Sequence, residues 1–586
     1  MTGVAAPSSR PPWTLPTGTV LFIALALFWG GVAVTRGVEH LGSDQQLNLV
    51  LVLKGADPSL FPSDLIFDGR DLQNEYIPLY IGFLRWAYRL TGDLTAGYKL
   101  LVVPLNLLFL FGAYAVFLRR CAIRWVAVIL AIFASLPFPT LAGELFGIGP
   151  VQVITARAVF TGVFPFLFLA FCAWLTRPRR LILLFFILGL LANLHPVSGL
   201  FVAPMLALTY VLEQRGRLQA WGMAVAMGAT TLLGAAPILW NQVHRLVAQG
   251  SAVSRAGDPL IARLVAQRMG YLLYPPHTLI SILPRGLVDL LTLVIALAPA
   301  VILVVAWRRQ GVVTSLTLHL AAVAVLAYIL FPGAKLLILL LGLLCFLSQG
   351  GGEEREDRVV VYFAYAIFWV SVGGVIAIQA LFYLLGRPVL FADMIRGVRF
   401  APFAVFLLLA SCIRRVDWSR LQRPAFIGCL VLALVTASWE ARHIVRTYLR
   451  TRGDAAAADL AAVARWARQT TDVGDLFLFD SPAFRVLAQR SLAFATKDGA
   501  AAIYHRPDRA GVWEDRLKAL RAAGADPVAL WEAGRRYGAQ YVVVPAEALG
   551  GVGLESRIRY QNATYAVLAT GQARLSGSLG TRGGAS

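Results

Sequence analysis

Long apolar stretches recur along most of the chain and are separated by short polar segments. A helix that crosses a bilayer needs about 17–25 mostly apolar residues. The pattern predicts such helices near residues 18–37, 97–118, 124–143, 158–176, 181–194, 196–212, 219–240, 286–307, 312–331, 333–349, 359–386, 398–413 and 424–443. We therefore expect a polytopic α-helical membrane protein with about 13 transmembrane helices.

Arginine residues cluster in every second connection between these stretches. The clusters are Arg119, Arg120 and Arg124; Arg177, Arg179 and Arg180; Arg215 and Arg217; Arg308 and Arg309; and Arg414, Arg415, Arg420 and Arg423. Short loops rich in Lys and Arg stay on the cytoplasmic side of a membrane. This rule places the N-terminal tail, residues 1–17, in the cytoplasm. An odd number of crossings then brings the C-terminal segment to the outer face.

The chain divides into a predicted transmembrane domain and a soluble domain. Residues 18–449 form the transmembrane domain, with large outer loops at 38–96 and 241–285. Beyond this point the pattern changes. It predicts amphipathic helices at 454–469, 515–523 and 530–537 and buried strands at 475–480 and 538–545. This alternation predicts a small α/β domain at 450–586, on the outer side of the membrane.

The composition agrees with a chain that is solvated mostly by lipid. Of the 586 residues, 58% are hydrophobic and 15% are charged, whereas a soluble domain carries roughly 25% charged residues. A net charge of +21 would suggest a nucleic-acid partner in a soluble protein. Here much of the excess lies in short loops, where it sets topology and meets anionic lipid headgroups. We therefore expect the lipid bilayer as a partner and no nucleic acid.

The chain has few of the patterns that bind metals or nucleotides. Its cysteines are scattered, without a Cys-x-x-Cys pair, and its histidines form no His-Glu-x-x-His motif. Neither a zinc site nor a disulfide framework is therefore indicated. No Gly-rich phosphate-binding loop is present, so no nucleotide site is predicted. The sequence leaves open whether carboxylates bind a divalent cation, and it does not identify a cofactor.

Ionisable residues gather where the predicted topology reaches the outer face. Asp44 follows the first apolar stretch, and Glu144 lies in the next outer connection. The basic candidates near the outer ends of spans are Arg157, His195, Lys335 and Arg396. Charges at the membrane edge are costly unless they are paired or functional. Interfacial anchoring explains any single one of them, but the whole set points to a site on the outer face.

In layout the chain resembles the GT-C class of integral-membrane glycosyltransferases, or uncharacterised bacterial membrane proteins of that architecture. The matching parts are the apolar stretch 18–37, Asp44 shortly after it, the acidic loop up to residue 96, Glu144, and the segment 450–586. The paired acidic motif of some GT-C members is absent, because Ser43 and Gln45 flank Asp44. Arg490-Ser491 and Lys497-Asp498 are similar to a Phe-Arg…Arg-Ser…Lys pattern in the uncharacterised proteins.

The resemblance implies a hexosyl- or pentosyltransferase of the cell envelope, located in the bacterial inner membrane. Such an enzyme takes a sugar from a polyprenyl-phosphate donor and passes it to an acceptor, which is unknown here. The resemblance implies Asp44 as the base for the acceptor hydroxyl and Glu144 as a second carboxylate. The departing phosphate needs positive charge. Arg157, His195, Lys335 and Arg396 are the candidates that would supply it.

Two other classes of protein fit the same pattern. A transporter or flippase of a lipid-linked or polar substrate would bury ionisable residues in mid-membrane and show paired repeats. The apolar stretches contain few such residues, and no repeat is evident. A non-catalytic membrane scaffold of GT-C-like architecture is the third interpretation, because the paired acidic motif is missing at Asp44.

Overall fold

The computed structural model describes residues 14–68, 77–139, 145–241, 355–374, 393–415, 455–504 and 506–571, together with the single positions 264, 442 and 446. The spans predicted near 286–307, 312–331, 333–349 and 424–443 lie outside the described residues, apart from position 442. Most of the outer loop 241–285 and of the tail 1–17 also lies outside them. The first helix, α1 (Thr14–Val34), begins within the segment that we assigned to the tail.

The chain forms two compact units that do not follow the chain order. The first unit contains residues 1–35, 98–244 and 265–447, and the second contains residues 36–97, 245–264 and 448–586. The first outer loop, which the sequence analysis placed in the transmembrane domain, therefore belongs to the same compact unit as the C-terminal segment.

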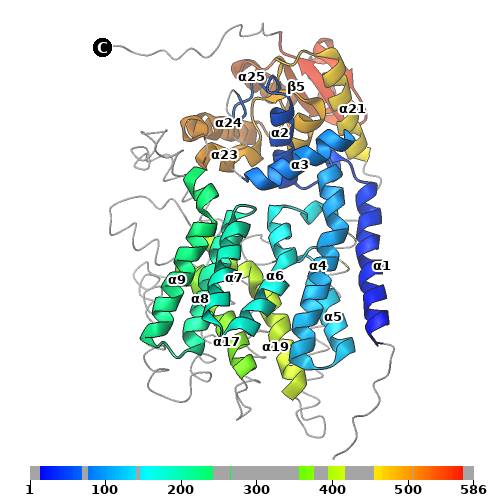
Figure 1. Cartoon of the computed structure of the whole chain (residues 1–586). Helices are drawn as coiled ribbons and strands as arrows, with labels where there is room; N and C mark the ends of the chain where they lie inside the picture. The colour runs from blue at the N-terminus through cyan, green and yellow to red at the C-terminus, as the bar shows by residue number, and fades with distance from the viewer. Residues whose placement is uncertain are drawn as a thin grey trace, which may run out of the picture. The chain divides into compact units, whose positions relative to one another are not determined.

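The first unit is built almost entirely from helices that run side by side (Figure 1). They are α1 (Thr14–Val34), α4 (Ala96–Cys121), α5 (Arg124–Ser135), α6 (Ala156–Trp174), α7 (Pro178–Ala192), α8 (Pro196–Glu213), α9 (Leu218–Gly234), α17 (Arg355–Phe368) and α19 (Ala401–Arg415), with the short helices η3 (Val151–Val153), η4 (Trp369–Gly373) and η5 (Asp393–Phe400). Among the described residues, 4 helices are long and apolar enough to cross a membrane: Ala96–Cys121, Ala156–Trp174, Pro196–Glu213 and Arg396–Arg414.

Helix α5 is shorter than the sequence predicted. The apolar pattern predicted a helix over 124–143, but α5 ends at Ser135. Proline has no backbone N–H to donate and disfavours helical geometry in the residue before it, and both Pro137 and Pro139 follow directly. The chain instead forms a short antiparallel pair between β1 (Phe138–Pro139) and β2 (Leu145–Phe146).

Aromatic side chains fill the space between α6, α17 and α19. The ring centroid of Phe164 lies 4.6 Å from that of Phe400 and 5.2 Å from that of Phe403. The ring of Phe168 lies 4.8 Å from that of Phe363. Such pairs add about 0.5–1.5 kcal/mol each beyond the area they bury. This cluster fixes α6 against the helical segment that runs from η5 into α19.

Helices α7 and α9 approach each other at glycine. A Cβ atom on Gly189 would lie 2.1 Å from the carbonyl oxygen of Thr231 and 2.9 Å from the Cα of Gly234. Asn193 completes the contact, because its side-chain amide donates to the Gly234 carbonyl at 3.0 Å and its Oδ1 accepts from the Ile238 N–H at 3.0 Å.

We expect Gly189→Ala to lower the free energy of unfolding by about 1–3 kcal/mol, because the added methyl group must push two helix backbones apart. The thermal midpoint of the purified chain measures the effect. Gly222→Ala in α9 is the matched control, since a Cβ there meets nothing within 4 Å. Equal midpoints for the two variants would show that α7 and α9 are not in this close contact.

The second unit contains a sheet with the strand order β4-β3-β5-β7-β6. The strands are β3 (Leu476–Leu478), β4 (Ser491–Leu492), β5 (Tyr541–Pro545), β6 (Ile558–Gln561) and β7 (Tyr565–Ala569). The pairs of β3 with β4 and with β5 are parallel, and the remaining pairs are antiparallel. The predicted alternation of helices and strands is confirmed for β3 and β5. The strand β4 and the hairpin of β6 and β7 were not predicted.

Helices cover both faces of this sheet. They are α21 (Ala455–Thr470), α22 (Pro482–Ala488), α23 (Gly499–Tyr504), α24 (Ala510–Ala523) and α25 (Pro527–Arg536), with the short helices η6 (Thr496–Asp498), η7 (Pro507–Arg509), η8 (Ala546–Leu549) and η9 (Glu555–Arg557). Successive strand residues point to opposite faces. Accordingly, Leu476 and Leu478 pack in the cluster that contains Leu530 of α25, whereas Phe477 packs with Val463 of α21.

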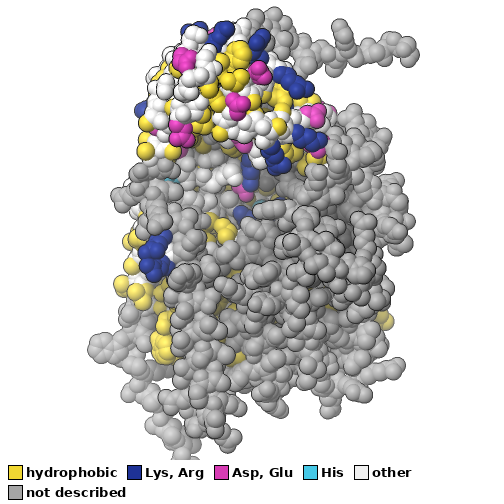
Figure 2. Space-filling model, turned by 180° about the vertical axis from the view of Figure 1, so that it is seen from behind, with side chains coloured by type: hydrophobic (Ala, Val, Ile, Leu, Met, Phe, Trp, Pro, Cys, Tyr) yellow, Lys and Arg dark blue, Asp and Glu magenta, His cyan; other side chains and the backbone are white. Residues whose placement is uncertain are grey.

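The first outer loop contributes η1 (Val38–His40), α2 (Ser43–Ala56) and α3 (Pro78–Thr91) to the same unit. Helix α2 packs against both α3 and α22. On the face seen in Figure 2, basic and acidic side chains are interspersed over the second unit.

Candidate anion-binding site

The turn between α7 and α8 positions His195. Pro196 is the first residue of α8, where its missing N–H costs nothing. His195 precedes it as the N-cap residue, and its Nδ1 accepts the backbone N–H of Ser198 at 3.2 Å. A side chain that satisfies one of the free N–H groups of the first turn stabilises a helix start. The sequence therefore fixes the imidazole at this end of the helix.

A chain of polar contacts runs from His195 to Arg399. The hydroxyl of Ser198 lies 2.5 Å from His195 Nδ1, and the Arg399 guanidinium donates to the same hydroxyl oxygen. Because Ser198 accepts from Arg399, its proton is directed to Nδ1. Nδ1 is then an acceptor, and the neutral ring carries its proton on Nε2.

Helix η5 supplies two arginines one turn apart. Arg396 and Arg399 lie three residues apart and therefore share a face. A Cβ atom on Gly397 would lie 2.5 Å from both Met205 Cε and Ser371 Oγ, so the absence of a side chain lets η5 approach α8 closely. Arg399 is buried, and its guanidinium carbon lies 4.8 Å from the centroid of the Phe400 ring.

Arg157 joins this group from the first turn of α6. Arg399, Arg157 and Arg396 all lie close enough to His195 to act on it electrostatically. The starts of the long helices α6 and α8 add partial positive charge. Elements distant in sequence thus bring three guanidinium groups close to the neutral His195 imidazole. We call this group the basic cluster: Arg157, His195, Arg396 and Arg399.

Two polar side chains close to Arg157 in the sequence lack hydrogen-bond partners among the described residues. Thr155 is the N-cap residue of α6 and is 9% exposed. Within the described part of the chain, Thr155 Oγ1 and the side-chain amide of Gln152 have no hydrogen-bond partner. Buried polar groups are nearly always paired.

Three of the six candidate site residues from the sequence come together in this cluster: Arg157, His195 and Arg396. Glu144 and Lys335 lie outside the described residues. Sequence reasoning did not select Ser198 and Arg399. Ser198 lies three residues after His195, and Arg399 lies three residues after Arg396. On a helix, this spacing places both residues of a pair on one face, which is the sequence signal that points to Ser198 and Arg399.

Asp44 lies in the second unit, in the first turn of α2. Its carboxylate forms an ion pair with Lys497 at 2.6 Å, and the two side chains are 53% and 41% exposed. An exposed pair of this kind contributes little to stability. Asp44 therefore remains accessible to solvent, with an ammonium group beside it.

Other acidic residues of the first outer loop have structural partners. Asp64 lies 2.9 Å from Arg485 Nε, and Asp498 lies 2.6 Å from Arg485 Nη2, with all three side chains fully buried. Asp64 also accepts the backbone N–H of Leu492 at 2.9 Å. Burial raises the pKa of Asp498 above its usual range, and the attraction of Arg485 only partly offsets it.

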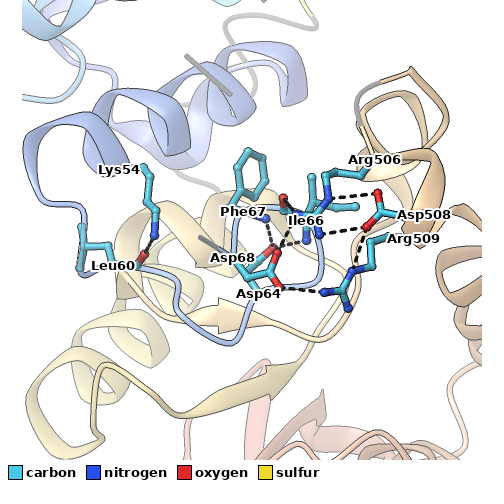
Figure 3. Close-up of polar contacts among 9 residues, drawn as sticks. All are labelled: Lys54, Leu60, Asp64, Ile66, Phe67, Asp68, Arg506, Asp508 and Arg509. Carbon is cyan, nitrogen blue, oxygen red and sulfur yellow. Dashed lines mark hydrogen bonds and ion pairs between the residues drawn. The ribbon is translucent and has the colours of Figure 1, made fainter. Parts of the chain in front are cut away.

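A second group of charges links the loop to η7 (Figure 3). Asp68 accepts from Arg506 at 2.6 Å and from Arg509 at 3.1 Å. Asp508 accepts from Arg506 at 3.3 Å and forms an ion pair with Arg509 at 3.5 Å. Asp64 and Asp68 thus hold the loop to the C-terminal segment and are not available as catalytic carboxylates.

No protein-family model matches this chain, and no curated protein matches it. The fold alone therefore describes the class of protein. In the part of the chain that the structure describes, it is mostly helical, with four helices long and apolar enough to cross a membrane and a small sheet region at the C-terminus. Among the described residues, no group of three or more His, Cys, Asp or Glu side chains is arranged to hold a metal ion.

Proposed function

We propose that this chain is an integral-membrane glycosyltransferase that moves a sugar from a polyprenyl-phosphate donor to an acceptor at the outer face. The observation that supports this proposal most strongly is the basic cluster. A polyprenyl phosphate carries its charge at the edge of the hydrocarbon region. A site for it needs cationic donors at the end of membrane helices, which is where α6, α8 and η5 present them.

In this proposal the basic cluster stabilises the charge that develops on the departing phosphate. Arginine guanidinium groups hold phosphate oxygens by paired hydrogen bonds. His195 would add its Nε2 proton as a further donor, held in that tautomer by Ser198. Asp44 would take the proton from the acceptor hydroxyl, with Glu144 as a second carboxylate. Lys335 is a further candidate for the phosphate.

The proposal includes the finer topology of the sequence analysis. It has about 13 spans, a cytoplasmic N-terminus and an outer C-terminal domain in a bacterial inner membrane. Transport of a lipid-linked substrate is the second candidate. It needs the same anion site but no base, and Asp64 and Asp68 of the acidic loop are engaged in ion pairs.

Asp44→Asn is expected to lower sugar transfer by about 10²–10⁴-fold, the usual contribution of a general base. The assay uses the full chain in vesicles with a radiolabelled polyprenyl-phosphate sugar and a cell-envelope extract as the source of acceptor. Asp57→Asn is the matched control, because Asp57 is an exposed carboxylate just after the same helix, and its side chain accepts from the N–H and the hydroxyl of Ser59.

Wild-type transfer by the Asp44→Asn variant would contradict the role of Asp44. Movement of labelled lipid across the bilayer without any glycosylated product would favour the transporter.

A further inference from the structure

Helix α3 carries an exposed apolar stripe. Leu79, Trp86 and Leu90 are 56%, 54% and 66% exposed, and Phe83 is partly exposed between them. Their spacing of four, three and four residues places all four side chains on one face of the helix. A stripe of large apolar side chains that faces outward marks an interaction surface.

The stripe is distinct from the face by which α3 packs. Tyr80, Ile81, Leu84 and Ala87 are buried, and α3 packs against α2. At about 100° per residue, these four positions lie on the side of the helix next to the stripe, not on it. The buried face of α3 therefore already packs into the second unit, and the stripe is a separate, exposed apolar surface.

The chain ties α3 to the start of a candidate membrane span. Helix α3 ends at Thr91 and is capped by Gly92, which is in the left-handed region at φ 70°, and α4 begins at Ala96. Asp93 makes the connection rigid, because its carboxylate accepts from both the N–H and the hydroxyl of Thr95. The five steps along the chain from Thr91 to Ala96 reach at most about 18 Å. The end of α3 therefore lies within that distance of the end of the span.

The first turn of α4 also packs directly on α3. A Cβ atom on Gly97 would lie 2.6 Å from Leu84 Cδ2 and 3.2 Å from Leu84 Cα. Glycine thus permits a close approach of the two helices. Within α4, Leu100 is itself 52% exposed.

Basic residues flank the stripe on its other side. Arg85 and Arg89 lie four residues apart, and Arg89 is exposed. Tryptophan and arginine are favoured where one side of a helix meets acyl chains and the other meets headgroup phosphates. A helix beside the end of a span, with an apolar stripe and adjacent arginines, has the chemistry of a helix that lies in the bilayer interface.

We propose that α3 lies in the interface of the leaflet where α4 begins, with its stripe among the acyl chains and its arginines at the lipid phosphates. This inference is independent of the proposed glycosyl transfer. A second copy of the chain is a poorer partner, because stable protein interfaces use about 20–30 residues a side. The stripe offers four side chains.

Spin labels test this placement in the full chain, reconstituted in bilayer nanodiscs. The native cysteines Cys121, Cys172, Cys345, Cys412 and Cys429 are first replaced by alanine. Trp86→Cys, Leu90→Cys and Leu79→Cys then carry the label on the stripe, and Arg89→Cys carries it on the basic side as the matched control. All four side chains are exposed, so labelling leaves the packed face intact.

We expect labels on the stripe to collide several-fold more often with dissolved oxygen, which concentrates in lipid, than with a water-soluble nickel chelate. The label at position 89 is expected to show the reverse. Equal access of the chelate to positions 86, 89 and 90 would overturn the proposal, because the stripe would then face water. Protection from both reagents together with spin–spin broadening between chains would also overturn it, in favour of a second copy.

Discussion

Substitution of Arg485 by methionine is expected to lower the free energy of unfolding of the second unit by about 3–5 kcal/mol. Arg485 is the shared counter-charge of Asp64 and Asp498, and all three side chains are fully buried. Its removal leaves two buried carboxylates without a cation. Asp64 comes from the first outer loop, so its release from the C-terminal segment accompanies the loss.

The loss in free energy of unfolding that Arg485→Met causes is expected to depend on pH. Asp498 has a raised pKa in the folded chain because it is buried. A carboxyl group of this kind favours the folded state when it is protonated, and this contribution is lost as the pH rises through its folded pKa. Removal of Arg485 removes the attraction that lowers this pKa. The variant is therefore least stable at high pH and recovers as the pH falls.

Hydrogen exchange of the backbone amides in β3 and β4 measures this effect in the full chain. Arg465→Met is the matched control, because Arg465 is exposed on α21 and its loss is expected to change stability by less than about 0.5 kcal/mol. Equal exchange in the two variants, or a deficit that grows as the pH falls, would contradict the assignment of Arg485 as the buried counter-charge.

Arg157→Gln and Arg396→Gln are each expected to weaken the binding of polyprenyl phosphate by about 10- to 150-fold. This range corresponds to the loss of one hydrogen bond to a charged group, about 1.5–3 kcal/mol. Both residues act on His195 from separate elements. Because they would share one ligand, the double variant is expected to lose less than the product of the single effects.

Titration of the full chain in nanodiscs with polyprenyl phosphate checks this expectation. Arg179→Gln is the matched control, because Arg179 is exposed in the first turn of α7. It lies about 20 Å along that helix from the His195 turn. If Arg396→Gln and Arg179→Gln bound the lipid equally well, the basic cluster would not be its site.

Within the described residues, the helices of the first unit were largely predictable from the sequence. The stretch predicted at 158–176 forms α6 (Ala156–Trp174), and that at 196–212 forms α8 (Pro196–Glu213). Long apolar runs make such predictions reliable, because few other structures satisfy their backbone groups in lipid. The exception is α5, where apolar residues continue after Ser135 but prolines end the helix.

Long-range pairing in the second unit was not predictable. Asp64 and Arg485 meet across more than four hundred positions, and nothing near either residue in the sequence indicates its partner. Hydropathy placed the acidic loop next to its flanking spans, whereas ion pairs and backbone hydrogen bonds join it to β4 and η7. Strand β4 has only 2 residues, too few for a detectable pattern.

The candidate site was predictable in part. Sorting basic residues by their position at span ends found Arg157, His195 and Arg396, because helix ends on one side converge in a bundle. Ser198 was not selected, since its contact with His195 Nδ1 depends on the backbone geometry of the helix start. The role of Arg399 depends on its burial beside Phe400, which the sequence does not show.

Native mass spectrometry of the purified full chain with polyprenyl phosphate, compared with the uncharged polyprenol of the same length, tests the phosphate site most directly. We predict saturable binding of polyprenyl phosphate in wild type, a loss of that binding in Arg157→Gln and Arg396→Gln, and much weaker binding of polyprenol to all three proteins. Equal binding of the two lipids by wild type would contradict a site that recognises phosphate and, with it, the proposed use of a polyprenyl-phosphate donor.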